Sequence, residues 1–180
     1  MRLLLDRLYL LSGWLAGLFL LAIFVLMLLL SGGRPLGIYI PAGDDLVAWC
    51  MAATAFLGLA HTFRSGEMIR VGLLIDRLEG RTRQITEIVA LVLGTGFVGF
   101  FSWHAARLTY DSWRFNDLAQ GVLAVPLWIP QLGYSVGLAI LLVAFVDELI
   151  HLLRGGAPRY EKPKPKTAEE AIEQAVQGGV

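Results

Sequence analysis

Four long apolar segments dominate the pattern of hydrophobic and polar positions along the chain. They cover about residues 8–30, 46–63, 87–106 and 127–146. A helix needs roughly 17 to 25 apolar residues to cross a bilayer, and each segment has that length. None carries Asp, Glu, Lys, Arg or His near its middle, where charge is costly. The pattern predicts an all-α integral membrane protein, with four transmembrane helices in one domain over residues 1–153.

The residues that flank these segments support helical spans. Asp44 and Asp45 precede the second segment, where carboxylates can cap a helix and interact favourably with its dipole. Pro126 and Pro130 open the fourth, and proline suits a first helical turn. The first segment exceeds the ~7 to 15 apolar residues of a signal peptide and has no Ala-x-Ala site after it. We therefore interpret it as a retained span.

Lysine and arginine lie mostly on one side of these predicted spans. Three stand on the other side, at Arg34, Arg107 and Arg114. Because positively charged loops stay in the cytoplasm, both termini and the middle loop are predicted to be cytoplasmic. The twelve residues on the cytoplasmic side are Arg2, Arg7, Arg64, Arg70, Arg77, Arg81, Arg83, Arg154, Arg159, Lys162, Lys164 and Lys166.

Two segments outside the spans differ in character. In the middle loop, about residues 65–79, apolar residues alternate with charged ones. This pattern predicts an amphipathic helix in the headgroup plane, and an ordinary solvated connector is the alternative. Residues 154–180 contain Gly-Gly and Lys-Pro repeats, then an acidic, alanine-rich stretch. We predict a mobile cytoplasmic tail there, because such a segment buries too little apolar area to offset its ordering entropy.

Composition excludes several functional classes. Apolar residues make up 56% of the chain and charged residues 17%, whereas soluble domains carry about 25% charged residues. The formal net charge is zero, so nothing points to nucleic acid. Cys50 is the single cysteine and lies in an apolar segment. The sequence contains no catalytic triad or metal motif, so we predict neither enzymatic activity nor a cofactor.

Glycines recur within the apolar segments at spacings typical of close helix packing. Gly13 with Gly17, and Gly133 with Gly137, have the G-x-x-x-G spacing. Gly94 opens a G-x-G-x-x-G string, but a dinucleotide site needs that string between a strand and a helix. We therefore interpret Gly94 as a helix-packing residue too.

Polar residues near the ends of the spans are the candidate functional groups. Arg64, Glu67 and Arg70 follow the second span, and Asp147 and Glu148 end the fourth. These five are candidates to contact a partner subunit or lipid headgroups, since interfacial arginine commonly binds lipid phosphate.

Histidines and hydroxyl groups leave two alternatives open. His61 and His151 are predicted on one side of the membrane and His104 on the other. A haem between His61 and His151, as in a respiratory membrane anchor, is therefore one alternative. The other is a small homo-oligomeric channel, for which the polar lining would be Thr54, Thr95, Ser102 and Ser135.

The string Phe56-Leu-Gly-Leu-Ala-His-Thr-Phe-Arg-Ser-Gly-Glu-Met-Ile-Arg-Val71 carries a family resemblance. Together with Asp44-Asp45, Asp76-Arg77 and Pro126-Leu-Trp-Ile-Pro130, it resembles the DctQ-like small membrane subunit of tripartite ATP-independent periplasmic (TRAP) transporters. The resemblance covers about residues 5–150. It implies a large multi-span permease that carries the substrate and sodium sites, and a periplasmic substrate-binding protein. It further implies secondary active uptake of organic acids such as dicarboxylates or sialic acid, with this chain as a scaffold.

Overall fold

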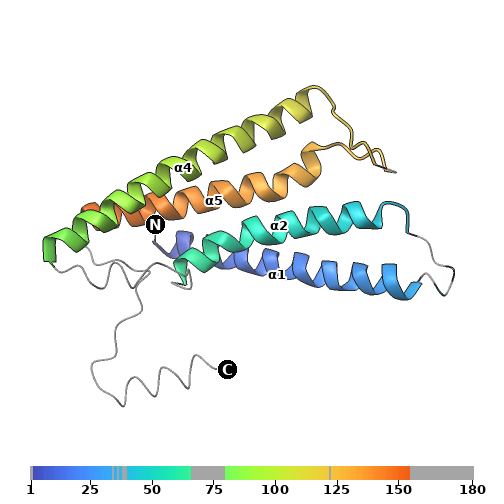
Figure 1. Cartoon of the computed structure of the whole chain (residues 1–180), viewed down its shortest axis with the longest axis horizontal. Coiled ribbons are helices and arrows are strands. Elements are labelled where there is room, and N and C mark those ends of the chain that lie inside the picture. The colour runs from blue at the N-terminus through green and yellow to red at the C-terminus, as the bar shows by residue number, and fades with distance from the viewer. Residues whose placement is uncertain are drawn as a thin grey trace, which may run out of the picture.

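A computed structural model describes residues 2–33, 35, 37, 40–65, 80–121 and 123–154. In this part of the chain four long helices form nearly all of the structure (Figure 1). Each contains a stretch long and apolar enough to cross a membrane, so the predicted all-α fold with four transmembrane helices is confirmed. The helices are α1 (Arg2–Gly33), α2 (Gly43–Arg64), α4 (Gly80–Arg114) and α5 (Trp128–Leu153).

Two predictions fall outside the described residues. The first is the interfacial helix predicted for about residues 65–79, of which the structure describes only Ser65. The candidate residues Glu67 and Arg70 belong to this segment. The cytoplasmic tail beyond Arg154 is the other. Both stay predictions.

The starts of α2 and α5 reflect their local sequences in different ways. The N-cap of α2 is Ala42, which makes no side-chain capping hydrogen bond, so the expectation that Asp44 and Asp45 cap this helix is wrong. Both aspartates instead lie in the first turn, where their carboxylates face the positive end of the helix dipole. Pro130 lies in the first turn of α5, where a backbone N–H would have no helical partner.

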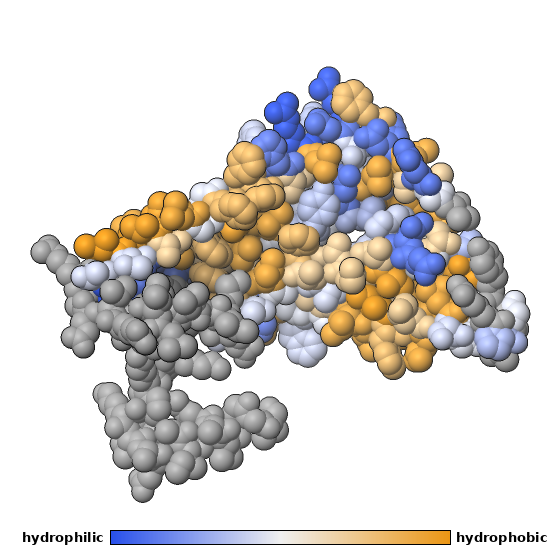
Figure 2. Space-filling view, in the orientation of Figure 1, coloured by the Kyte–Doolittle hydropathy of each residue, from blue (hydrophilic) through white to orange (hydrophobic). Residues whose placement is uncertain are grey.

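α4 is longer than the apolar segment within it. Its 35 residues span about 52 Å at 1.5 Å per residue, against ~30 Å for the hydrocarbon of a bilayer. The helix continues through Arg107 and Arg114 because backbone hydrogen bonding does not require apolar side chains. Figure 2 shows hydrophilic side chains gathered over this end of α4 and the segment that follows it.

The helices form a row and not a closed bundle. α1 packs on α2, α2 on α5, and α5 on α4, so α1 and α4 are the two edges (Figure 1). We call the end where α1 and α4 begin the termini end, and the opposite end the loop end. α2 and α5 both run from the loop end to the termini end and are therefore parallel neighbours.

The buried side chains form two clusters. The larger joins all four helices toward the termini end, and the smaller joins α1 and α2 nearer their middle. The row leaves much apolar surface uncovered. In the most apolar stretch of α1 only 6% of the residues are buried, whereas in that of α5 33% are buried. The large cluster contains Tyr9, Ala60, Phe63, Leu91, Leu141, Ala144 and Leu152, and the small one Ala16, Ala53 and Leu57.

Candidate functional site

Polar side chains from three helices meet at the termini end. Arg64 of α2, with Asp147 and Glu148 of α5, lines a small cavity together with Tyr9 of α1. The Arg64 Nη2 atom lies 3.2 Å from Oδ1 of Asp6, which extends the cluster along α1. Three of the predicted candidates, Arg64, Asp147 and Glu148, therefore lie side by side. Sequence reasoning did not single out Asp6 as a partner of Arg64.

The members of this cluster differ in exposure. The side chains of Arg64 and Asp6 are 31% and 51% exposed, so water or headgroups screen their attraction. Glu148 is only 3% exposed. A buried carboxylate is costly unless neighbouring groups compensate it. Of the residues in this cluster, Glu148 is therefore the one whose substitution should change the free energy of unfolding most.

A second ion pair lies within the first turns of α4. The Arg83 Nε atom is 3.2 Å from Oε1 of Glu87, one helical turn later. Glu87 is buried, although the sequence pattern marks it only as the first residue of the apolar segment at about residues 87–106. The spacing of four residues between opposite charges was the available signal. Glu87 is therefore a second buried carboxylate near the termini end, and Arg83 compensates its charge.

Glycines bring α2 and α5 close together. A Cβ atom on Gly137 would stand 2.5 Å from the Phe56 carbonyl carbon and 2.6 Å from its oxygen. A Cβ on Gly133 would stand 2.8 Å from Cβ of Ala53. Because the obstacle at Gly137 is backbone, no rotamer change would relieve it. The two helices can therefore lie this close only while position 137 lacks a side chain.

Gly94 has a different neighbour. A Cβ there would stand 2.8 Å from Cε1 of Phe145 on α5. The Phe145 ring in turn stacks on Phe63 of α2, with centroids 4.4 Å apart and planes at 16°. Phe145 therefore links α4 to α2 through α5, and the absence of a side chain at Gly94 leaves room for its ring.

The contact between α1 and α2 combines a glycine with a hydrogen bond. A Cβ on Gly13 would stand 2.9 Å from Cγ of His61. One residue earlier, the buried Ser12 hydroxyl donates to the Leu57 carbonyl oxygen over 2.5 Å. Sequence reasoning missed Ser12, although a serine next to a packing glycine is a familiar polar contact between membrane helices. Gly17 has no atom within 4 Å of a Cβ position.

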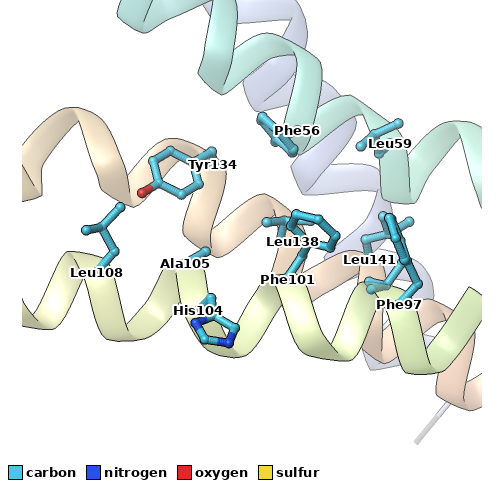
Figure 3. Close-up of a pocket in the computed structure, with 11 residues that line it drawn as sticks. Phe56, Leu59, Phe97, Phe101, His104, Ala105, Leu108, Tyr134, Leu138 and Leu141 are labelled. Atoms are coloured by element: carbon cyan, nitrogen blue, oxygen red, sulfur yellow. The ribbon is translucent and has the colours of Figure 1, made fainter.

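An apolar groove of about 510 Å³ lies along α5 between α2 and α4. Figure 3 shows Phe56 of α2 on one side of it and Phe97 and Phe101 of α4 on the other. Tyr134 and His104 bring polar atoms to a lining that is otherwise apolar. Because the rest of its lining is apolar, the groove is suited to apolar chains or side chains.

At the loop end, residues 115–127 connect α4 to α5. Leu118 and Pro126 form an isolated antiparallel bridge, and the Leu127 N–H donates to the Asp117 carbonyl oxygen over 2.9 Å. This connection also approaches the start of α2, since a Cβ on Gly121 would meet the Asp45 carboxylate. The segment is thus held at both of its ends and against α2.

One family comparison bears on this architecture. Residues 23–155 match the sequence model described as the DctQ component of tripartite ATP-independent periplasmic transporters. The chain belongs to the DctQ family. It is therefore a small membrane component of a TRAP transporter and a multi-pass membrane protein. The resemblance inferred from the Phe56–Val71 string is confirmed.

DctQ membership also places the chain in a class of multisubunit systems. The family is a transporter component that works with a large permease and a periplasmic binding protein. Searches of curated proteins and of solved structures found no match to this chain.

Proposed function

We propose that this DctQ protein is the fixed accessory subunit of a transporter for organic acids such as dicarboxylates or sialic acid. The large multi-span permease carries the substrate and sodium sites, and a periplasmic binding protein delivers the substrate. The subunit braces the static part of the permease while the transport part moves. Uptake is secondary active transport, driven by the sodium gradient.

One observation carries this proposal: the middle of every span lacks ionisable side chains. Between Arg7 and Arg34, for example, there is no Asp, Glu, Lys, Arg or His. Transporters bind substrate and coupling ion near the midplane, through polar groups and broken helices. α1, α2, α4 and α5 are each continuous over the apolar stretch. The binding sites therefore belong to another subunit.

The charge distribution supports an orientation for this subunit in the bacterial inner membrane. Twelve of its fifteen Lys and Arg residues flank the spans on the side of both termini, which we assign to the cytoplasm. In a Cys50→Ser background, a cysteine replacing Asp117 should react with a membrane-impermeant maleimide in intact spheroplasts. A cysteine replacing Arg154 should react only after permeabilisation. The reverse pattern would invert the orientation.

We further propose that the cluster at the termini end contacts the permease or lipid headgroups. Arg64, Asp147 and Glu148 belong to it, and Glu67 and Arg70 follow in the sequence. At the opposite end, Arg107, Asp111, Arg114 and Asp117 are candidates to meet the binding protein, and an ordinary solvated loop is the alternative. The α4–α5 connection supports this role, since backbone hydrogen bonds such as that from the Leu127 N–H to the Asp117 carbonyl oxygen tie its two ends together.

Charge reversal at the buried Glu148 should impair assembly with the permease. Glu148→Lys places a cation in the buried site beside Arg64, whereas Glu148→Gln keeps the shape of the side chain and removes its charge. We expect Glu148→Lys to lower permease recovery at least about tenfold, with a smaller loss for Glu148→Gln. Thermal unfolding of the isolated subunit separates loss of folding from loss of contact. Because Glu148 is buried within the subunit, it would act by positioning Arg64 and Asp147, and full assembly and activity of Glu148→Lys would contradict that role.

The test of the whole proposal is purification of the tagged subunit from its native membrane in mild detergent. Mass spectrometry should identify a large multi-span permease. Liposomes with both subunits and the binding protein should take up labelled organic acid only under an inward sodium gradient. A lone homo-oligomer that conducts ions, or a haem spectrum with soluble redox subunits, would refute it.

A further inference from the structure

The two edge helices expose different kinds of apolar surface. α1 exposes mostly aliphatic side chains, with Trp14 and Phe24 as its exposed rings, and carries an apolar groove of about 620 Å³ with a mostly aliphatic lining. Within seven residues, α4 exposes Phe97, Phe100, Phe101 and Trp103. Aliphatic surface matches acyl chains, whereas aromatic residues are enriched where proteins contact one another. The edges therefore differ in the neighbour that they suit.

Gly96 lies directly before this aromatic surface, between it and the exposed aliphatic residues Val92 and Leu93. It is one turn before Phe100, on the side of α4 opposite the buried residues Leu91 and Ser102. No atom of the described chain lies within 4 Å of where its Cβ would stand. Glycine is a poor helix former, so this position weakens α4 without serving a contact among the residues that the structure describes. A small residue beside large rings is, however, the shape that admits a neighbouring membrane helix.

The aromatic surface continues into the groove beside it. Phe97 and Phe101 belong to both, so the exposed face of α4 and the groove along α5 form one uneven surface. Ring pairs hold its aromatic members against each other: Phe97 with Phe101 at 4.6 Å and Phe100 with His104 at 4.4 Å between centroids. Such paired rings resist rearrangement, which favours a neighbour of fixed shape over a mobile acyl chain.

The available area is suited to a stable protein contact. The four aromatic side chains are between 46% and 69% exposed. At roughly 200 Å² for each ring side chain, they offer roughly 500 Å². Exposed aliphatic neighbours such as Leu93 add to this, and a standard interface buries about 800 Å² on each partner. The face of α4 can thus supply most of one interface.

We infer that the face of α4 that contains Gly96 and Phe100, with the adjoining groove, is the docking surface for a transmembrane helix of the large permease subunit. The inference rests on the proposed function, since it assigns a surface to a partner named there. The partner helix lies beside Gly96 and inserts apolar side chains between the rings. α1, at the other edge of the row, faces lipid.

Gly17 provides a matched control for a test at Gly96. Both glycines lie in exposed positions of an edge helix, and neither has an atom within 4 Å of a Cβ position. Gly96→Leu and Gly17→Leu therefore leave the isolated subunit folded, which thermal unfolding of each variant checks. Each variant is co-expressed with the large permease of its own transporter and purified through a tag on the small subunit. We expect Gly96→Leu to lower permease recovery at least tenfold and Gly17→Leu to change it less than twofold.

A second measurement keeps the inference falsifiable if Gly96→Leu does not accumulate. A photoreactive benzophenone amino acid replaces Phe100 on α4 or Leu21 on α1 in the assembled complex. Irradiation should yield a permease adduct from position 100 at least fivefold above that from position 21. Equal yields, a higher yield from position 21, or no adduct from position 100 would overturn the docking surface. Failure of the unmodified subunit to co-purify with any permease would instead refute the proposed function.

Discussion

α2 is held to its two neighbours in different ways. Against α5, Gly133 and Gly137 let the helices approach until a Cβ on Gly137 would meet backbone. Against α1, the Ser12 hydroxyl donates to the Leu57 carbonyl oxygen, and Arg64 pairs with Asp6. In hydrocarbon, apolar side chains gain little by leaving lipid, so helices associate through close packing and hydrogen bonds. α2 therefore relies on close packing against α5, and against α1 on polar bonds together with close packing, since a Cβ on Gly13 would stand 2.9 Å from Cγ of His61.

The largest effect is expected where backbone meets backbone. Gly137→Leu forces α2 and α5 apart, because the obstacle cannot rotate away, and should lower the free energy of unfolding by roughly 3 kcal/mol. Reversible unfolding of the purified subunit in mixed micelles measures it. Gly17→Leu, in open space, is the control and should change stability by less than about 0.5 kcal/mol. Equal stabilities of the two variants would mean that the α2–α5 crossing is not tight.

Alanine at Gly137 and at Gly94 separates a backbone obstacle from a side-chain one. Alanine gains about 1 kcal/mol of helix propensity over glycine at either site. At Gly94 the obstacle is the Phe145 ring, which can shift, so we expect a net change near zero. At Gly137 we expect a net loss of about 1 to 2 kcal/mol. The same unfolding assay compares the two, and a larger loss at Gly94 would reverse our assignment.

Ser12→Ala removes the hydrogen bond on the other side of α2. Hydrogen bonds between membrane helices contribute about 0.6 kcal/mol on average, so we expect a loss of roughly that size, up to about 1.7 kcal/mol. Ser31→Ala, exposed near the end of α1, is the matched control and should be neutral. A loss as large as that of Gly137→Leu would show that polar bonds, not close packing, dominate the fold.

The smallest effect is expected at the exposed ion pair. Asp6→Asn removes the charge that pairs with Arg64 and should cost at most about 0.5 kcal/mol. The loss should shrink between 20 and 500 mM NaCl, on the order of the change in screening expected for an exposed pair. Asp117→Asn in the α4–α5 connection controls for the general effect of losing one acid. A salt-independent loss would indicate that the pair is shielded from solvent.

The helices themselves were predictable because crossing a bilayer is a local requirement. Apolar length between Arg7 and Arg34, or before Asp147, identifies a span whatever lies beside it. The bounds were less predictable: α4 continues to Arg114, since a helix does not end where its apolar stretch ends. Ala42, not Asp44 or Asp45, is the N-cap of α2, because the chain enters the helix before either aspartate.

The candidate contacts were predictable as residue types and not as pairs. G-x-x-x-G spacing indicates small residues on one helix face, yet Gly137 meets Phe56 while Gly17 meets no atom of the described chain. Arg64 was a candidate, but Asp6 lies 58 residues away in the sequence, and nothing local links the two. Ser12 has the same difficulty with Leu57.

Three properties can be read from the sequence alone: the lipid environment of the helices, the four spans and the DctQ membership. These follow from apolar length and from a short string of residues, both of which are properties of contiguous chain. The tertiary structure decided the order of helices in the row, the partner of each glycine and the distinct faces of α1 and α4. These depend on which helix lies beside which, and a helix with apolar residues on every side carries no period that selects its neighbour.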